Sequence, residues 1–329
     1  RMLLYLRMGC IIILFHSLYD PYMKGSAKGN IAMTISKTFS GLNENALRYL
    51  LPAWMSAYSG VVLRLVFGCV SFWVTGVFTR RSTIATTARQ KLGMFALGAI
   101  CVFGYMFFLL EGLTYTTPIS SSIFISMQPI WVFTICVIFL HERVTGKKIA
   151  GILLGLSGAL VIILTQKSSD VASDPFRGNM FCLFSSVLYS LYLVFEKQML
   201  SRTDMVTVTK WTFFGGMCSS LVMICFTGWD APVLSQHLFS TPMLVLLFVL
   251  IFPTTVSYFL IAIGLRNLSA TVVALYGYLI LVVAALVSYV LGQDHFDWWQ
   301  MLAMVLIVFS VYFVEISESR ENAKSITGK

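Results

Sequence analysis

The sequence has little charge and few acidic residues. Only 11% of its 329 residues are charged, and Asp and Glu together number 14. Soluble domains carry about 25% charged residues. A chain with so few charges cannot cover a folded surface with solvated groups, so the composition excludes a soluble globular protein.

The motifs that identify common enzymes and metal sites are also lacking. The seven cysteines form no C-x-x-C pair, so they indicate neither zinc nor a disulfide framework. His141-Glu142 lacks the second histidine of a zinc protease, and no phosphate-binding loop, dinucleotide fingerprint or nucleophile elbow occurs in a suitable context. We therefore predict no enzyme activity, no metal and no cofactor.

Long apolar segments make up most of the chain. Hydrophobic residues are 58% of it, and a bilayer-spanning helix needs about 20 predominantly apolar residues. We predict an all-α integral membrane protein with ten transmembrane helices. Their predicted spans are 30–50, 54–78, 91–112, 116–140, 148–165, 177–200, 206–227, 242–265, 268–291 and 298–317.

An internal repeat relates the two halves of the chain. Residues 112–163 align without a gap with residues 264–315, an offset of 152, and both segments begin with Gly-Leu. Nearer the start of each half the offset is 149, which places Arg48 on Lys197. We therefore predict a first five-helix repeat at 29–165, a loop at 166–177, a second five-helix repeat at 178–317, an N-terminal extension outside the fold at 1–28 and a cytoplasmic tail at 318–329.

Charge near the predicted helix ends indicates that the two repeats have inverted topology. The connector at 141–148 is basic, whereas the equivalent connector at 293–298 has no Lys or Arg. Basic residues collect on the cytoplasmic side, and an odd number of helices per repeat inserts the second copy upside down. We predict a multi-pass protein of the cytoplasmic (inner) membrane with both termini cytoplasmic. The net charge of +9 then reports topology and lipid contact and does not indicate a nucleic-acid partner.

The first predicted helix carries an unusual number of polar side chains. Lys37, Glu44 and Arg48 share one helical face, and Asn43 lies on the adjoining stripe. Charges near the centre of a bilayer cost about 2.5–3.5 kcal/mol each on insertion scales, so they normally face a cavity or a partner. Asn43, Glu44 and Arg48 are therefore candidate substrate contacts. In the alternative, Glu44 and Arg48 only neutralise each other at i, i+4.

Further polar side chains lie deep in later apolar runs. Ser126 and Gln128 lie just before Pro129, which removes a backbone donor and is tolerated at the midplane where another group or a watery cavity satisfies the freed carbonyl. Helix packing through small residues is the alternative. We assign Ser126, Gln128, Tyr189, Tyr192, Tyr276 and Tyr278 to substrate binding, and Pro129 and Gly277 to conformational change.

These features resemble the drug/metabolite transporter superfamily, EamA type, whose members have ten helices in two inverted five-helix repeats. The resemblance covers residues 29–317 and is strongest from the Gly-Leu-Thr-Tyr-Thr-Thr-Pro segment at 112–118, through Pro129 and Glu142, to Gly-Ile-Leu-Leu-Gly at 151–155. The chain departs from the family pattern at Ser40, Arg48, Leu281 and Asp294.

The resemblance implies a secondary transporter that works by alternating access. It favours export of an amino acid or a related small polar metabolite, and the first predicted helix fits a zwitterionic or anionic solute with Arg48 or Lys37 at its carboxylate. The expected partners are this small-molecule substrate and the lipid bilayer. Proton coupling through Glu44 and simple equilibration both stay open. So do an intramembrane enzyme acting on a lipid-linked substrate and a channel, although a channel should carry a ring of like residues or a carbonyl filter.

Overall fold

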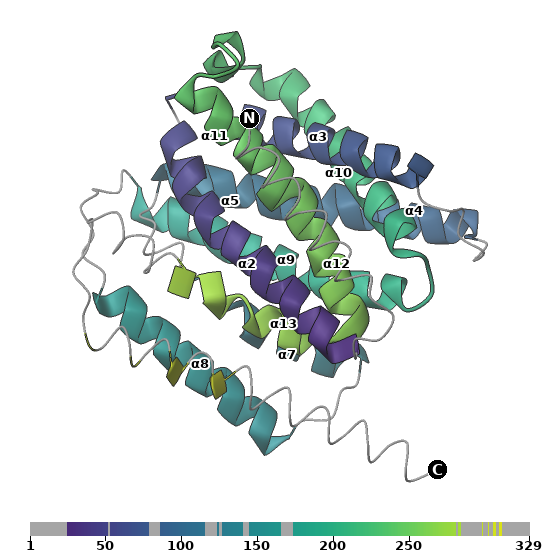
Figure 1. The fold of residues 1–329 in the computed structure, drawn as a ribbon, viewed down its shortest axis with the longest axis vertical. Coiled ribbons are helices and arrows are strands. Elements are labelled where there is room, and N and C mark those ends of the chain that lie inside the picture. The colour runs from purple at the N-terminus through teal and green to yellow at the C-terminus, as the bar shows by residue number, and fades with distance from the viewer. Residues whose placement is uncertain are drawn as a thin grey trace, which may run out of the picture.

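The computed structural model describes residues 25–51, 53–78, 86–115, 127–140, 145–165 and 174–280, together with residues 124, 282, 283, 298, 302, 305, 306, 309 and 310. All secondary structure in this part of the chain is helical. The elements, shown in Figure 1, are α2 (Gly25–Leu50), α3 (Ala57–Phe78), α4 (Ala88–Leu97), η1 (Gly98–Val102), α5 (Phe103–Tyr115), α7 (Gln128–Leu140), α8 (Gly146–Thr165), α9 (Pro175–Leu200), α10 (Met205–Thr227), η2 (Pro232–Ser235), α11 (Thr241–Val249), η3 (Leu250–Val256), α12 (Ser257–Asn267) and α13 (Ala270–Leu275).

Several of these helices are long and apolar enough to cross a membrane. Among the described residues there are five such spans: Ala57–Phe78, Ala88–Tyr115, Phe176–Leu200, Met205–Thr227 and Thr241–Asn267. The all-helical, membrane-spanning architecture is thus confirmed for this part of the chain. Most of the predicted helix 298–317 and much of the predicted helix 268–291 lie outside the described residues, and the count of ten helices stays a prediction.

Local capping residues set where several helices begin and end. The side chain of Asp204 accepts a hydrogen bond from a backbone N–H in the first turn of α10, and Asp174 does the same for α9. Thr87 and Gln90 form a capping box at the start of α4. α10 ends at Thr227, and the next residue, Gly228, has a φ of 81°, which suits a residue without a Cβ. Because these capping signals are local, the observed ends of these helices lie close to the predicted ones.

Helices from the two halves pack against each other. α3 lies along α10, α5 along α9, and α2 along α12, and each pair joins one helix from either side of the 166–177 loop. Figure 1 shows α2 running beside α12 on the near side of the molecule. The buried apolar core is continuous across these pairs. The two halves therefore form one interleaved bundle.

Two π-helical turns interrupt the helices at equivalent positions in the two halves. η1 begins at Gly98 and η3 begins at Leu250, which is 152 residues later and matches the offset of the sequence repeat. π turns are rare and often mark functional sites. Their recurrence at the same register is evidence for the repeat that does not depend on sequence identity.

The cause of the second π turn is visible in its own residues. Pro253 lies inside η3 and supplies no backbone N–H, so carbonyls of the preceding turn lose their usual donor. The hydroxyl of Thr254 donates to the carbonyl of Val249 at 2.9 Å, and that of Thr255 donates to the carbonyl of Leu250 at 3.1 Å. These threonines replace backbone hydrogen bonds inside an apolar helix.

The glycines that open the two sequence repeats make equivalent contacts. A Cβ on Gly112 would lie 2.9 Å from Cys182 Sγ, and a Cβ on Gly264 would lie 2.3 Å from Met33 Sδ. Met33 and Cys182 are themselves separated by the offset of 149. In each half, this glycine lets the third helix approach the first helix of the other half, which explains why both copies begin with it.

A closer crossing brings α10 against the junction of α4 and η1. A Cβ on Gly98 would lie 1.7 Å from the carbonyl oxygen of Thr212, and a Cβ on Gly215 would lie 2.0 Å from that of Phe95. Small residues allow this approach of two backbones in membrane proteins. Gly98 and Gly215 therefore set the distance between these helices.

The fourth and ninth predicted helices are both interrupted near the middle of their spans. α7 begins at Gln128, and Pro129 is its second residue, where the missing N–H is not needed. α13 ends at Leu275, and a turn at 276–277 precedes a further helical turn at 278–280. In the first repeat, the described turn is at Met127, directly before α7. Interrupted helices in both repeats of a transporter point to a binding site between them.

Candidate substrate cavity

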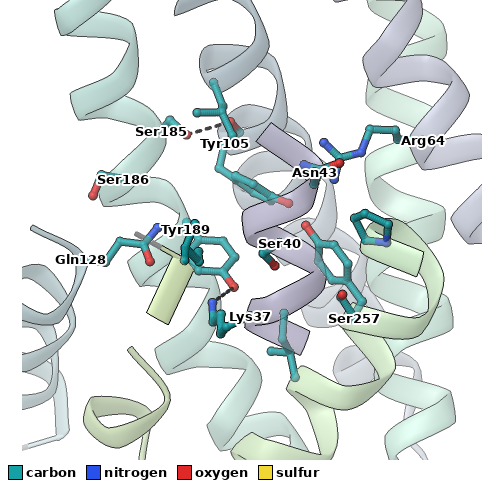
Figure 2. Close-up of a pocket in the computed structure, with 15 residues that line it drawn as sticks. Lys37, Ser40, Asn43, Arg64, Tyr105, Gln128, Ser185, Ser186, Tyr189 and Ser257 are labelled. Atoms are coloured by element: carbon teal, nitrogen blue, oxygen red, sulfur yellow. Dashed lines mark hydrogen bonds between the residues drawn. The ribbon is translucent and has the colours of Figure 1, made fainter. Parts of the chain in front are cut away.

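A cavity lies among helices of both halves of the protein (Figure 2). Its volume is about 80 Å³, which holds several water molecules because one water needs roughly 10–15 Å³ by this measure. It is lined by Lys37, Ser40, Asn43, Arg64, Tyr105, Leu109, Gln128, Ser185, Ser186, Tyr189, Pro253, Ser257, Tyr258, Ile261 and Ile280.

Most of the lining positions are related by the repeat. Ten of these fifteen residues form five pairs whose members are 149 residues apart in the first helix of each repeat and 152 apart from the third helix onward. The pairs are Lys37 with Ser186, Ser40 with Tyr189, Tyr105 with Ser257, Leu109 with Ile261, and Gln128 with Ile280. The cavity thus lies where corresponding parts of the two repeats face each other.

Two hydrogen bonds between helices beside the cavity follow the same pattern. The hydroxyl of Ser36 donates to the carbonyl of Ser257 at 3.1 Å, and the hydroxyl of Ser185 donates to the carbonyl of Tyr105 at 2.9 Å. The serines are 149 residues apart and the carbonyls 152 apart. Each repeat therefore attaches its first helix to the third helix of the other repeat through the same bond.

Lys37 extends from α2 into the cavity wall and is only 2% exposed. Its Nζ donates to the hydroxyl of Tyr189 at 3.2 Å and lies 5.2 Å from the centre of that ring (Figure 2). None of the lining side chains is acidic. A buried charge is costly unless it is paired, so a phenol leaves the ammonium of Lys37 incompletely compensated.

Arg64 reaches the cavity from α3 and is 4% exposed. Its Nε donates to the hydroxyl oxygen of Thr254 at 3.0 Å, so the π turn η3 holds the guanidinium in place. Its Nη1 has no hydrogen-bond partner in the described part of the chain. Arg64 is not among the site residues predicted from the sequence. The available signal was its position inside an apolar span, where charges face a cavity or a partner.

Two predicted amide side chains complete the polar wall. Asn43 Oδ1 and Gln128 Oε1 are buried in the cavity lining, and neither finds a hydrogen-bond partner within the described ranges. The same holds for the hydroxyl of Tyr258. Buried polar atoms are nearly always hydrogen-bonded. These three atoms are therefore placed to bind a polar solute or water.

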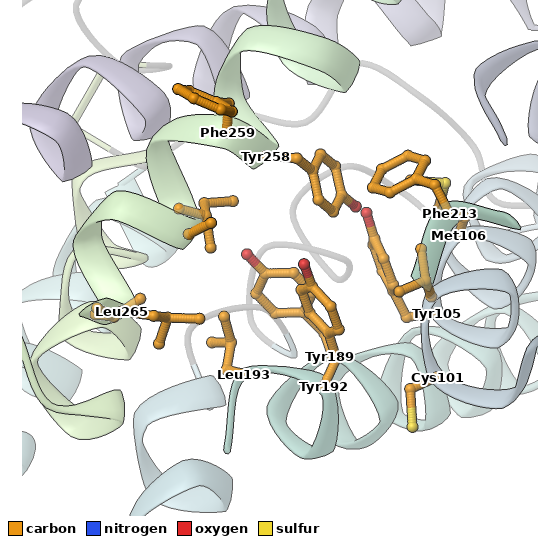
Figure 3. Packing of buried hydrophobic residues seen from close by; sticks show 14 of the residues in the cluster. Cys101, Tyr105, Met106, Tyr189, Tyr192, Leu193, Phe213, Tyr258, Phe259 and Leu265 are labelled. Carbon is orange, nitrogen blue, oxygen red and sulfur yellow. The ribbon is translucent and has the colours of Figure 1, made fainter. Parts of the chain in front are cut away.

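Four tyrosines pack together along the cavity (Figure 3). Ring centres are 4.9 Å apart between Tyr105 and Tyr189, 5.9 Å between Tyr189 and Tyr192, and 6.1 Å between Tyr192 and Tyr258. Tyr192 is fully buried behind the other three, which line the cavity. Aromatic walls with a few fixed polar groups are typical of sites for small organic solutes.

The structure separates the predicted site residues into those that line the cavity and those that do not. Asn43, Gln128 and Tyr189 line it. The hydroxyl of Tyr278 donates to the carbonyl of Ile152 at 3.4 Å, toward α8 and away from the cavity. The predicted residues that are buried but outside the lining are Pro129, Tyr192, Tyr276, Gly277 and Tyr278.

Three predicted residues fall outside what the structure describes. Ser126 is one, and the side chains of Glu44 and Arg48 are the others, although their backbones belong to α2. The repeat counterpart of Arg48 is Lys197. Its Nζ donates to the carbonyl of Leu265 and, at 2.8 Å, to that of Leu268. Lys197 thus caps the end of α12, as a cation at a helix C-terminus should.

One buried carboxylate lies beside the tyrosines without lining the cavity. Glu196 is on α9, one turn after Tyr192, and has no exposed surface. Its carboxylate interacts with the hydroxyl of Tyr192 on the preceding turn. Within the described ranges, no group of three or more His, Cys, Asp or Glu residues could hold a metal ion.

Comparison with known proteins places this architecture in context. The model of the EamA-like transporter family matches the chain twice, at residues 27–164 and 176–316. The uncharacterized transporter YyaM of Bacillus subtilis is 22% identical over 274 residues, which are 83% of this chain and 88% of YyaM. The S-adenosylmethionine uptake transporter of Rickettsia bellii is 23% identical, over 67% of this chain and 73% of its own. A solved crystal structure with 18% identity shares the fold at a TM-score of 0.71, over 90% of this chain and 98% of that one.

Proposed function

Because the chain belongs to the EamA-like transporter family, we propose that it moves a small polar metabolite through the cavity between its two repeats by alternating access. The family, the related transporters and the apolar helices make it a multi-pass membrane protein that transports a small molecule. The proposal adds the site, the mechanism and the kind of substrate.

The observation that carries this proposal is the pairing of the lining residues by the repeat offsets. In transporters built from inverted repeats, the two halves exchange conformations, and one site at their interface is reached from either side in turn. A cavity formed by corresponding positions of both halves meets this geometric requirement. The π turns at Gly98 and Leu250 and the interrupted helices at Gln128 and Gly277 supply places where the halves can bend.

The polarity of the cavity supports a polar solute, which we take to be an amino acid or a related compound. Two cations, two amides and three tyrosines converge on a space of about 80 Å³, so the conformation described here fits a small molecule. We assign export as the direction of transport, although the relative from Rickettsia bellii is named for uptake. We also propose that both termini lie in the cytoplasm, that the protein lies in the cytoplasmic membrane, and that its repeats span 29–165 and 178–317.

Flux through purified protein in proteoliposomes tests this function. We expect saturable uptake of labelled amino acids and counterflow, in which unlabelled solute inside the vesicle accelerates entry of label. Gln128→Ala should reduce the flux at low substrate concentration, whereas Thr134→Ala, on the exposed face of the same helix α7, should not. Flux without saturation or counterflow would indicate a channel. Appearance of a chemically altered product would indicate an enzyme.

A further inference from the structure

We infer that the cavity is a binding site for a small organic acid that also carries a hydrogen-bond donor, such as an amino- or hydroxy-carboxylate. Arg64 and Lys37 hold the carboxylate, and the oxygens of Asn43 and Gln128 accept from the donor. This inference rests on the proposed transport function and adds the chemical groups that the substrate must have. It assigns Arg64 as an anchor of the substrate anion.

The charge of the cavity is the first reason. Lys37 and Arg64 are both buried, and no described acidic side chain lines the cavity with them. Each charge inside a span costs about 2.5–3.5 kcal/mol on insertion scales. An anionic group on the substrate offsets this cost, whereas a solute with only an ammonium group would add to it.

The directions in which the two cations are held are the second reason. The Nε of Arg64 donates a hydrogen bond to Thr254, whereas its Nη1 has no hydrogen-bond partner in the described structure. An ammonium group has three N–H donors, and Tyr189 accepts from Lys37. In Figure 2, Arg64 and Asn43 lie to one side of the cavity, and Lys37 lies with Tyr189 and Gln128 to the other. Two anchored cations with free donors thus face one small cavity, and together they favour an anionic group within it.

The amide oxygens supply the other half of the recognition. Asn43 Oδ1 and Gln128 Oε1 can only accept hydrogen bonds, and neither has a donor among the described residues. A simple carboxylate offers them no donor, so it should bind less tightly than an acid that carries one. An amino or hydroxyl group on the same molecule satisfies them. The site therefore distinguishes amino and hydroxy acids from plain acids.

The comparison between the repeats shows that the fold does not itself require these charges. At the offset of 149, the counterpart of Lys37 is Ser186. Arg64, in the second helix, falls on Phe213 at the offset of 149 and on Gly216 at the offset of 152. The same helix positions are thus built with uncharged side chains in the second repeat. Because packing at these positions works without a cation, the two charges in the cavity wall are best explained by a ligand.

The test measures the thermal stability of the purified full chain against matched compounds on two skeletons. Alanine, lactate, propionate and alaninamide form one set, and leucine, 2-hydroxy-4-methylpentanoate, 4-methylpentanoate and leucinamide form the other. A ligand that binds the folded state raises Tm. We expect the amino or hydroxy acid of at least one set to raise Tm by several degrees, the plain acid less, and the amide not at all. An amide that raises Tm as much as its acid, or no rise with any acid, would overturn the inference.

Substitutions at Arg64 and Lys37 test whether these two residues bind the acid. Arg64→Gln and Lys37→Gln should each weaken binding of the acid about tenfold or more, since each removes a charge-assisted hydrogen bond. Arg64→Lys should restore part of the affinity. Lys210→Gln is the matched control, because Lys210 also lies inside a span but packs over Trp73 outside the cavity. Without ligand, Lys37→Gln should be at least as stable as the original chain, since it removes an incompletely paired buried charge. Unchanged affinity in both cavity variants would contradict the assignment.

Failure of this inference is distinguishable from failure of the proposed function. Saturable counterflow of a neutral polar solute, with no binding of carboxylates, would leave the transport function standing and remove the anion site. Carboxylate binding that depends on Arg64, without flux in proteoliposomes, would leave the site standing and remove the transport mechanism.

Discussion

The crossing of α10 over the junction of α4 and η1 gives a sharp prediction about stability. A Cβ on Gly98 would lie 1.7 Å from the carbonyl oxygen of Thr212, whereas real Cβ contacts are essentially never below 3.0 Å. In Gly98→Ala the two backbones must therefore move apart by about 1.3 Å, the difference between these distances. Both atoms are fixed by the backbone, so no side-chain rotation can relieve the contact.

The size of the effect follows from opposing contributions. A radial gap of roughly 0.5–1 Å already forfeits a quarter to a half of each dispersion contact along the crossing, and overpacking costs about 1–3 kcal/mol, occasionally more. Alanine stabilises a helix by about 1 kcal/mol relative to glycine, which offsets part of this cost. We expect Gly98→Ala to lower the free energy of unfolding by about 2 kcal/mol or more.

Gly215→Ala should behave in the same way, since its Cβ would lie 2.0 Å from the carbonyl oxygen of Phe95 at the same crossing. A single movement of α10 away from the junction of α4 and η1 relieves both contacts. The double variant should therefore lose less stability than the sum of the two single variants, as expected for coupled neighbouring sites.

The assay is unfolding of the purified full chain in mixed micelles of increasing SDS content, followed by tryptophan fluorescence. Gly93→Ala is the control on the same helix, because its Cβ would meet only Met199 Cε at 3.7 Å. It should be unchanged or more stable by up to about 1 kcal/mol. If Gly98→Ala proved as stable as Gly93→Ala, α10 and η1 could not cross as closely as described.

Three further predictions concern the site and the topology. Gln128→Ala should weaken substrate binding by roughly 1–3 kcal/mol without lowering expression, because a buried hydrogen bond is lost; a binding isotherm that does not change would exclude Gln128 from the site. Cysteines placed singly by Ala85→Cys and Asp294→Cys, in a background without reactive native cysteines, should be labelled by an impermeant maleimide from opposite sides of the membrane. Labelling of both from one side would refute inverted repeats. If Glu44 and Arg48 only neutralise each other, Glu44→Gln combined with Arg48→Gln should transport nearly normally, whereas a folded double variant without flux would assign a functional role to at least one of them.

Much of the helical framework could be predicted because its causes are local. A run of apolar residues long enough for a bilayer, ended by a capping side chain, needs no tertiary information. The predicted helix 206–227 is α10 at Met205–Thr227, with Asp204 as its N-cap, and the predicted helix 177–200 is α9 at Pro175–Leu200. The internal repeat was also readable, because the glycines at 112 and 264 recur with the apolar pattern.

The identity of the cavity residues was only partly accessible. Helical spacing groups Tyr189 and Tyr192 on neighbouring positions of one helix, yet Tyr189 lines the cavity and Tyr192 lies behind it. Arg64 offered no local partner, since the hydroxyl that holds it belongs to Thr254, 190 residues away. Spacing shows which residues share a face, but the neighbour of that face is chosen by long-range packing.

Composition, helix spans and the twofold repeat were determined by the sequence itself, because each depends on properties of nearby residues or on direct comparison of the two halves. The pairing of lining residues across the repeats and the convergence of Lys37 with Arg64 were decided by tertiary structure. They depend on contacts between residues 80–221 positions apart, such as Ser185 with Tyr105 and Ser36 with Ser257. No local pattern encodes such contacts, since their energy exists only once the helices of both halves have packed together.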